Sequence, residues 1–176
     1  ANYDTLTGLP NRALLSERLG RAIVRARRQE TRVAVLFLDL DRFKDINDSL
    51  GHAAGDRLLK AAGSRIQATV GASDTVARLG GDEFTVILED VESLAAVERM
   101  AREILTAFSM PLEVDERHDV AITPSLGLRL YPYHALVPPD LWQFADTAMY
   151  HPNAEVRTAF PIHIVTMSPT APPAVP

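Results

Sequence analysis

Two pairs of carboxylates stand out because each follows a hydrophobic run or a glycine turn. Asp39 and Asp41 end the apolar stretch from 33 to 41, and Asp82 and Glu83 follow two glycines. Residues alternate faces along a strand, so Asp39 and Asp41 leave it on the same side. If the segment after the glycines pairs with this strand, Asp39 meets Asp82 or Glu83, and carboxylates that close repel unless a proton or cation offsets them. The arrangement predicts a divalent-cation site.

The available ligands favour magnesium or manganese over zinc. The chain has no cysteine and no histidine at ligand spacing, which leaves hard oxygen donors. Magnesium keeps several waters and usually shares its shell with phosphate, so a nucleotide is the natural partner. Gly80 and Gly81 would let a triphosphate lie against backbone. The segment 45–56 is spaced like a calcium loop, but Leu50 and Asp56 stand where that loop needs Gly and Glu.

Each of these residues also has a purely structural explanation. The segment 80–83 fits an ordinary exposed hairpin tip, and acids commonly end strands. Asn47 suits a turn or helix cap, Asp56 an N-cap, and Lys44 a solvated helix face. The occurrence of both acidic segments in one chain weighs against the structural explanation for the carboxylates.

Helices and strands alternate in the pattern expected around these residues. The expected elements are a helix over 12–28, a strand over 33–41, a short helix, a break at Gly51 and Gly55, a helix over 56–69, two strands within 74–90, a helix over 91–108, a strand pair within 112–132 and a helix over 141–150. The strand over 33–41 is continuously apolar, which predicts cover on both faces. Two hairpins require a mixed or largely antiparallel sheet with helices packed on it, an α/β (α+β) fold.

Composition sets the frame for this fold. A chain of 176 residues with 47% apolar residues predicts one soluble domain. A net charge of −5 argues against nucleic acid or an anionic membrane as partners, and no apolar run approaches the roughly 20 residues that span a bilayer. Because the chain begins at Ala1 rather than Met, we expect a segment of a longer protein. We assign 1–165 to the domain and 166–176, rich in Pro and Ala, to an unstructured or non-native tail.

Four stretches in order, "DTLTGLPNR", "FLDLDRFKDINDSLGHAAGD", "ARLGGDEF" and "ADTAMY", carry a resemblance to a known family. Together they cover roughly residues 4 to 150, and the chain resembles the diguanylate cyclase, or GGDEF, family of bacterial signalling enzymes. The resemblance implies a ferredoxin-like core related to class III nucleotidyl cyclases and to the palm of polymerases. It also implies a reaction, in which two GTP condense into cyclic di-GMP and release two pyrophosphates.

The resemblance assigns catalytic and metal-binding roles to the acidic residues. Asp39 would bind magnesium or manganese through its side chain and Leu40 through its backbone carbonyl, with two ions in each active site. Asp82 matches the acidic metal ligand of the signature, and Glu83 the second essential acid, also placed at the metal. Which of Asp82 and Glu83 takes the proton from the attacking 3′-hydroxyl stays open.

The resemblance also assigns the GTP-binding residues. Lys44 matches a position that reaches the terminal phosphates, and Gly80 and Gly81 let phosphate and base approach the turn. Asn47 and Asp56 match positions that recognise guanine. That chemistry is reasonable, since a carboxylate accepts from the guanine N1–H and N2 amine, where adenine offers no matching donors.

The chain departs from the family pattern in two places. The inhibitory product site needs an Arg-x-x-Asp pair, and here Gly71 replaces the Arg although Asp74 is present, so we expect that site not to be intact. After Tyr150 the family continues with a Lys and a Gly-Arg-Asn stretch that completes the phosphate site. Here Asn153 and Val156 replace the Lys and the Gly, and only Arg157 falls in register, which is expected to lower phosphate affinity or activity.

The resulting hypothesis is an excised diguanylate cyclase domain that acts as a homodimer. Each site holds one GTP, so bond formation needs two subunits facing each other across a two-fold axis. The expected location is the bacterial cytoplasm, including as part of a membrane-anchored parent with sensory or phosphodiesterase domains. The alternative is a catalytically weak, GTP-binding regulatory domain that controls an attached cyclic di-GMP phosphodiesterase.

Overall fold

The computed structural model describes residues 1–132, 156–157 and 163–164. The helices are α1 (Arg12–Gln29), α2 (Phe43–Leu50), α3 (His52–Thr69) and α4 (Leu94–Ala107). The strands are β1 (Arg32–Leu40), β2 (Thr75–Gly80), β3 (Glu83–Val91), β4 (Leu112–Glu113), β5 (Asp119–Val120), β6 (Pro124–Tyr131), β7 (Val156–Arg157) and β8 (His163–Ile164).

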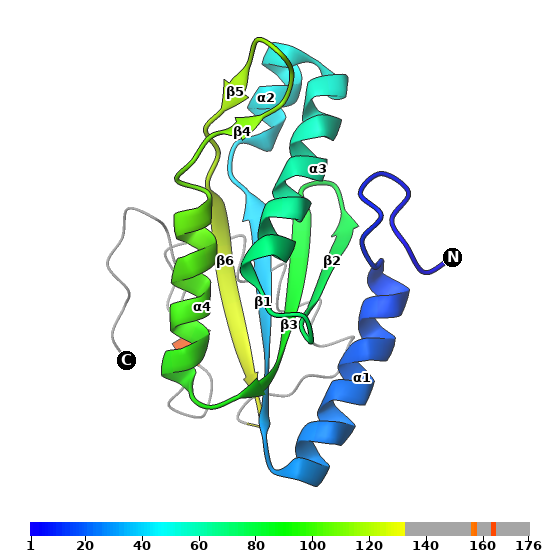
Figure 1. Ribbon diagram of the computed structural model, residues 1–176, viewed down its shortest axis with the longest axis vertical. Helices are drawn as coiled ribbons and strands as arrows, with labels where there is room; N and C mark the ends of the chain where they lie inside the picture. The colour runs from blue at the N-terminus through cyan, green and yellow to red at the C-terminus, as the bar shows by residue number, and fades with distance from the viewer. Residues whose placement is uncertain (133–155, 158–162, 165–176) are drawn as a thin grey trace.

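The central sheet has four strands in the order β2-β3-β1-β6, and every neighbouring pair is antiparallel (Figure 1). The antiparallel sheet predicted from the sequence is therefore confirmed. β1 lies inside the sheet with β3 and β6 on its two sides, and the β2–β3 hairpin carries the Gly-Gly turn. The pairs β4–β5 and β7–β8 form separate two-stranded sheets.

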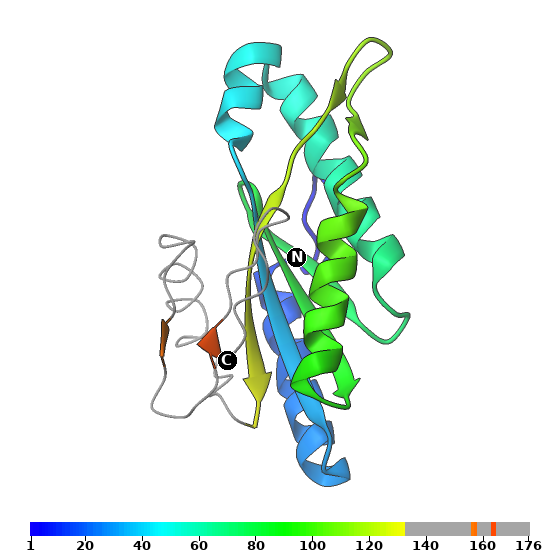
Figure 2. The same cartoon turned by 90° about the vertical axis from the view of Figure 1, so that its left-hand side faces the viewer.

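Both faces of the sheet are covered, which explains why β1 is apolar along its whole length. Val33, Val35 and Phe37 face α1 and pack with its buried residues Leu15 and Leu19. The intervening residues of β1 face the opposite side, where α3 and α4 supply the larger core (Figure 2). The alternation of faces follows from the two-residue period of a strand. The predicted two-sided burial is confirmed.

Two segments differ from the sequence-based expectation. α3 begins at His52, four residues earlier than expected. Gly55 therefore lies inside α3, and Gly51 by itself separates α2 from α3. The expected strand pair within 112–132 is instead the short β4–β5 hairpin followed by β6, which joins the central sheet beside β1. The predicted helix over 141–150 and the tail from 166 lie outside the described residues. Among the described helices, none combines the length and apolarity that crossing a membrane requires.

Candidate active site

The acidic strand end and the signature turn meet at one end of the sheet. Antiparallel pairing places Asp39 of β1 opposite Glu83 of β3, and the Leu40 amide donates to the Asp82 carbonyl at 3.2 Å. The end of β1 and the β2–β3 turn lie side by side there (Figure 1). The sequence-based expectation that Asp39 meets the Asp82–Glu83 pair is confirmed.

Asp39 is held in a setting that disfavours its charge. Burial raises the pKa of Asp39 to about 8, helped by a hydrogen bond with Asp82 and by the negative charges of Asp82, Glu83 and Asp41. Its Oδ1 atom is buried and has no hydrogen-bond partner in the part of the chain that the structure describes. A buried carboxylate oxygen without a donor is costly, and a bound cation would remove both the cost and the repulsion.

This donor set fits a magnesium-like ion. Among the described residues, no three Asp, Glu, His or Cys side chains gather closely enough to bind one metal. A cation here would therefore rest on few carboxylates, with backbone, water or phosphate oxygens completing its shell. Magnesium is commonly bound in this way, through one or two carboxylates together with substrate phosphates.

The glycine turn is open on its outer surface. Gly80 has φ +137° and Gly81 φ +50°, and no heavy atom of the described residues lies within 4 Å of where a Cβ would stand on either residue. These conformations favour glycine, and the space above the turn is available to a ligand.

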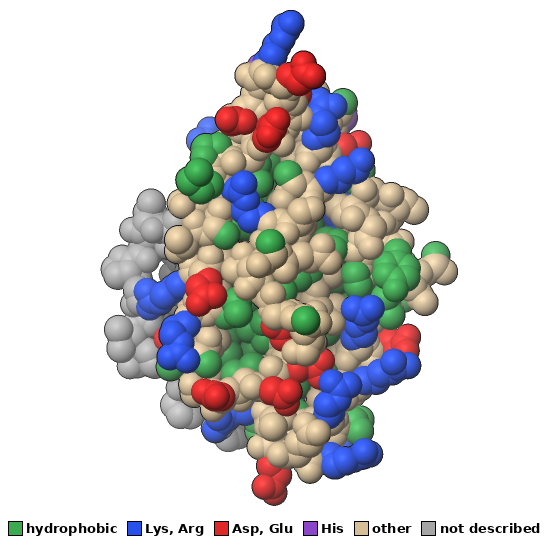
Figure 3. Space-filling view, viewed as in Figure 1, with side chains coloured by type: hydrophobic (Ala, Val, Ile, Leu, Met, Phe, Trp, Pro, Cys, Tyr) green, Lys and Arg blue, Asp and Glu red, His purple; other side chains and the backbone are tan. Residues whose placement is uncertain are grey.

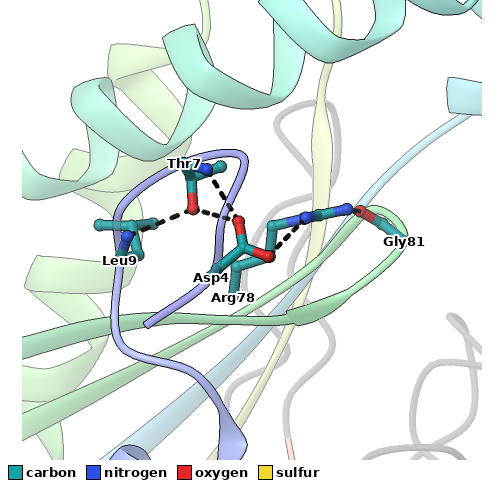
Figure 4. A network of polar contacts seen from close by, with 5 residues as sticks. All are labelled: Asp4, Thr7, Leu9, Arg78 and Gly81. Atoms are coloured by element: carbon teal, nitrogen blue, oxygen red, sulfur yellow. Dashed lines mark hydrogen bonds and ion pairs between the residues drawn. The ribbon is translucent and has the colours of Figure 1, made fainter. Parts of the chain in front are cut away.

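Arg78 fixes this turn to the N-terminal loop (Figure 4). Its Nε and Nη2 donate to the Gly81 carbonyl at 3.0 and 2.7 Å, and its Nη1 donates to Asp4 Oδ1 at 2.8 Å. The other oxygen of Asp4 accepts from the Thr7 amide and hydroxyl at 2.8 and 2.6 Å. We call these four residues, Asp4, Thr7, Arg78 and Gly81, the turn clamp. It ties the position of the signature turn to a loop more than seventy residues earlier in the chain.

The ion pair of the turn clamp is largely shielded from water. The Arg78 side chain is 12% exposed and that of Asp4 16%. Burial alone would raise the pKa of Asp4, but the bonds from Thr7 and Arg78 outweigh it, and the pKa lies below its ordinary value. Asp4 is therefore charged at neutral pH.

Asp41 has a different environment from Asp39. Its carboxylate accepts from the Ser125 hydroxyl at 2.5 Å and from the Thr123 hydroxyl at 3.3 Å, and its amide donates to the Thr123 carbonyl. Asp41 thus joins the end of β1 to the start of β6 and helps fix the strand end that carries Asp39.

The GTP-binding candidates Lys44, Asn47 and Asp56 lie on the α2–α3 pair that follows β1. Lys44 is exposed in the first turn of α2, and Asp56 is exposed on α3. Asn47 is half-buried, and its Oδ1 is another buried side-chain oxygen without a partner among the described residues. Asp56 lies inside α3, so the alternative of a helix N-cap is wrong for it.

Local contacts fill the region of Gly71 and Asp74, where the inhibitory product site is expected not to be intact. Asp74 Oδ2 accepts from the Gly71 amide at 2.9 Å, and Asp74 Oδ1 accepts from the Glu89 amide at 3.1 Å. Nearby, Arg25 forms an ion pair with Glu89 at 2.5 Å. Asp74 therefore closes the loop before β2 and links it to β3.

Charge is distributed without a dominant sign on the face that Figure 3 shows, where basic and acidic side chains are intermixed.

Arg157 lies on β7, which pairs with β8 rather than with the central sheet, and its side chain is not described. Asn153 lies outside the described residues.

Sequence reasoning missed two contributors to this site. The Asp4–Thr7 half of the turn clamp was visible only as part of the stretch "DTLTGLPNR", although Asp followed three residues later by Thr is a local turn pattern. The partners of Asp41, Thr123 and Ser125, carry no such signal because their contact with it joins segments more than eighty residues apart.

The antiparallel palm with paired acids at the end of its central strand defines a nucleotidyl cyclase-like domain. The chain belongs to the GGDEF family, since the family model described as "Diguanylate cyclase, GGDEF domain" matches residues 1–158. Two of the solved structures that resemble it are GGDEF proteins. The GGDEF domain of TpbB (YfiN) from Pseudomonas aeruginosa has 46% identity and a TM-score of 0.79, covering 84% of this chain and 86% of that one. A sensory box/GGDEF family protein from Caulobacter crescentus CB15 has 38% identity and a TM-score of 0.79, covering 86% and 97%.

The curated relatives are larger proteins. Diguanylate cyclase TpbB of Pseudomonas aeruginosa is 45% identical over 89% of this chain, which spans 36% of that protein. The bifunctional diguanylate cyclase/cyclic di-GMP phosphodiesterase MucR of the same organism is 45% identical over 91% of this chain, which spans 23% of MucR. Cyclic di-GMP phosphodiesterase PdeR of Escherichia coli is 39% identical over 85%, and this chain spans 22% of it.

Proposed function

We propose that this domain is a diguanylate cyclase that condenses two GTP into cyclic di-GMP and two pyrophosphates. The observation that carries the proposal is the strand register that sets Asp39 opposite Glu83 and next to Asp82, with a buried Asp39 oxygen that has no partner among the described residues. This is the arrangement that a metal-bound triphosphate would complete, beside a turn whose outer surface is open.

The chain's own residues would position the reacting groups. The 3′-oxygen of one GTP attacks the α-phosphorus of the other, a P–O bond forms, and the bond to the β-phosphate breaks to release pyrophosphate. The 3′-hydroxyl proton passes to a carboxylate of the signature, Asp82 or Glu83. Asp39, Asp82, Glu83 and the Leu40 carbonyl would hold two magnesium or manganese ions, which supply positive charge for the attacking oxygen and the leaving pyrophosphate.

Lys44, exposed at the start of α2, would reach the terminal phosphates, and Gly80 and Gly81 would let them approach the backbone. Asn47 and Asp56 would hold the guanine edge. Arg157 is proposed to contribute to the phosphate site.

Catalysis is proposed to need a homodimer, since each site binds one GTP and the attacked phosphate belongs to the GTP bound by the other subunit. Sensory or phosphodiesterase domains in a longer parent would supply regulation; the names of MucR and PdeR include a cyclic di-GMP phosphodiesterase activity. We further propose a bacterial cytoplasmic location, compatible with a membrane-anchored parent.

Feedback binding of product at Gly71 and Asp74 is proposed to be weak, because Asp74 already accepts two hydrogen bonds from backbone amides.

A second candidate function is a catalytically weak GTP-binding domain that regulates an attached phosphodiesterase. The altered segment after Tyr150 favours it, as does the likeness to PdeR and to the phosphodiesterase NbdA of Pseudomonas aeruginosa, which is 38% identical over 88% of this chain.

The two candidates separate in one experiment. The domain, fused to a parallel coiled coil that forces dimerisation, is incubated with GTP and Mg²⁺, and cyclic di-GMP and pyrophosphate are quantified. The cyclase proposal expects both products and their loss in Glu83→Gln. GTP binding without product would refute the cyclase and support the regulatory domain.

A further inference from the structure

The helix pair that carries the proposed guanine-binding residues is connected by a single glycine. Gly51, with φ +89°, ends α2 and precedes α3, and its amide donates to the Asn47 carbonyl at 2.9 Å. The side chain of Asn47 on α2 lies against Gly55 in the first turn of α3, and Asp56 is the next residue. Gly55 is buried in the contact between the two helices, and Asp56 beside it is exposed.

The Asn47 side chain occupies the space that any side chain on Gly55 would fill. A Cβ on Gly55 would stand 1.8 Å from Asn47 Oδ1 and 3.0 Å from Asn47 Cγ, with Phe43 Cζ at 3.3 Å. The first distance is far inside van der Waals contact, so no residue other than glycine fits while Asn47 keeps this position.

The other helix glycines do not share this constraint. A Cβ on Gly20 of α1 meets no atom within 4 Å, and one on Gly63 of α3 meets first the flexible end of Leu9, at 2.9 Å. Gly is also less favourable than Ala in a helix interior, so its presence at 55 calls for a packing reason.

The contact also places one end of the Asn47 carboxamide out of reach of a ligand. Its Oδ1 is buried against Gly55 without a hydrogen-bond partner. The amide nitrogen is then the end left to donate to an acceptor on the base, while the neighbouring Asp56 can only accept when ionised. One donor beside one acceptor matches a guanine edge, which offers carbonyl or ring-nitrogen acceptors next to the N1–H and N2 donors.

We infer that Gly55 is a positioning residue that determines nucleotide specificity, because its missing side chain lets Asn47 lie against α3 beside Asp56. The inference rests on the proposed function, which places guanine at these two residues. Gly55 would act through Asn47 and make no contact with the nucleotide itself.

The test measures binding of α,β-methylene GTP and α,β-methylene ATP, whose scissile bond is replaced, with Mg²⁺ present. The variants are Gly55→Ala, Asn47→Ala, the double variant, and Gly20→Ala as the matched control. We expect Gly55→Ala to weaken the GTP analogue about 10-fold or more, as loss of a buried hydrogen-bonding group does, with the ATP analogue unchanged. Gly20→Ala should bind both as wild type does.

The double variant distinguishes positioning from a general packing defect. If Gly55 acts through Asn47, the double variant binds the GTP analogue as Asn47→Ala does. Thermal unfolding gives a second readout. Gly55→Ala should lower Tm in the wild-type background because of the clash with Asn47. In the Asn47→Ala background that clash is absent, and the higher helix propensity of Ala should raise Tm by about 2–4 °C.

Three results would overturn the inference. Wild-type selectivity in Gly55→Ala would refute the inference and leave the proposed function standing. Additive losses in the double variant would do the same. A wild-type domain with no preference for the guanine analogue would refute the proposed function, and with it this inference.

Discussion

The turn clamp gives the sharpest stability prediction, because one side chain joins two distant segments. Arg78→Met removes all three hydrogen bonds while keeping most of the apolar stem. Arg78→Lys keeps the charge near Asp4 but lacks the planar fork that contacts the Gly81 carbonyl twice. Asp4→Asn removes the charge of the partner with little change of shape.

The expected loss follows from the three contacts and their exposure. A hydrogen bond to a charged group contributes about 1.5–3 kcal/mol net, and water can replace the two bonds to the exposed Gly81 carbonyl at low cost. Asp4 keeps its two bonds from Thr7, so it is not left without donors. We therefore expect Arg78→Met to lower the unfolding free energy by about 3 kcal/mol and Arg78→Lys by about 1.5 kcal/mol.

Urea unfolding of the domain without nucleotide measures these losses, and a double-mutant cycle of Asp4→Asn with Arg78→Met isolates the ion pair. The coupling energy should be about 1–2 kcal/mol, and the Tm of Arg78→Met should fall by about 6–12 °C for a domain of this size. Arg99→Met, at an exposed position on α4, is the matched control and should stay within about 0.5 kcal/mol of wild type.

The contribution of the clamp also has a defined pH dependence. Because the folded-state pKa of Asp4 is lowered, its stabilisation is fully present above the ordinary value of 3.8 and is lost as the pH falls through the lower folded value. A coupling energy near zero at neutral pH, or Arg78→Lys as stable as wild type, would refute the account of the clamp as a charge-assisted, two-pronged contact.

Two further predictions concern the acidic strand end and the end of α1. Burial and its acidic neighbours raise the pKa of Asp39 to about 8, so the folded domain holds a proton that the unfolded chain loses near 3.8. Without metal, the unfolding free energy should therefore fall by about 1–3 kcal/mol between about pH 5 and pH 8, after allowance for partial exposure. Asp39→Asn should remove most of this pH dependence. Urea unfolding in EDTA measures it, and an unfolding free energy that rises with pH would contradict the prediction. Glu30 takes a left-handed conformation (φ 55°) after α1, which favours glycine. Glu30→Gly should therefore raise the unfolding free energy by about 0.5–1 kcal/mol, and a loss of stability in urea unfolding would contradict this expectation.

The sequence predicted the parts of this fold that depend on local pattern. The continuous apolar run of β1 indicated two covered faces, and the glycine turn between apolar segments indicated the β2–β3 hairpin. The meeting of Asp39 with Asp82 and Glu83 followed once that hairpin was paired with β1, because register in an antiparallel sheet fixes which residues oppose each other. The placement of β6 beside β1 was not predicted, since hairpin rules favoured pairing it with its neighbour in sequence.

Gly55 shows why the remainder could not be predicted from pattern alone. In the sequence, two glycines four residues apart indicate a break between helices, and this holds for Gly51 but not for Gly55. The cost of a helical glycine is local and small, about 1 kcal/mol, whereas the clash that another residue would make with Asn47 comes from a second helix. Tertiary packing therefore outweighs propensity at this position. The same reasoning applies to the ion pair of Arg78 with Asp4, because it joins the signature turn to an N-terminal loop that is distant in sequence, so the geometry of the turn depends on a segment outside it.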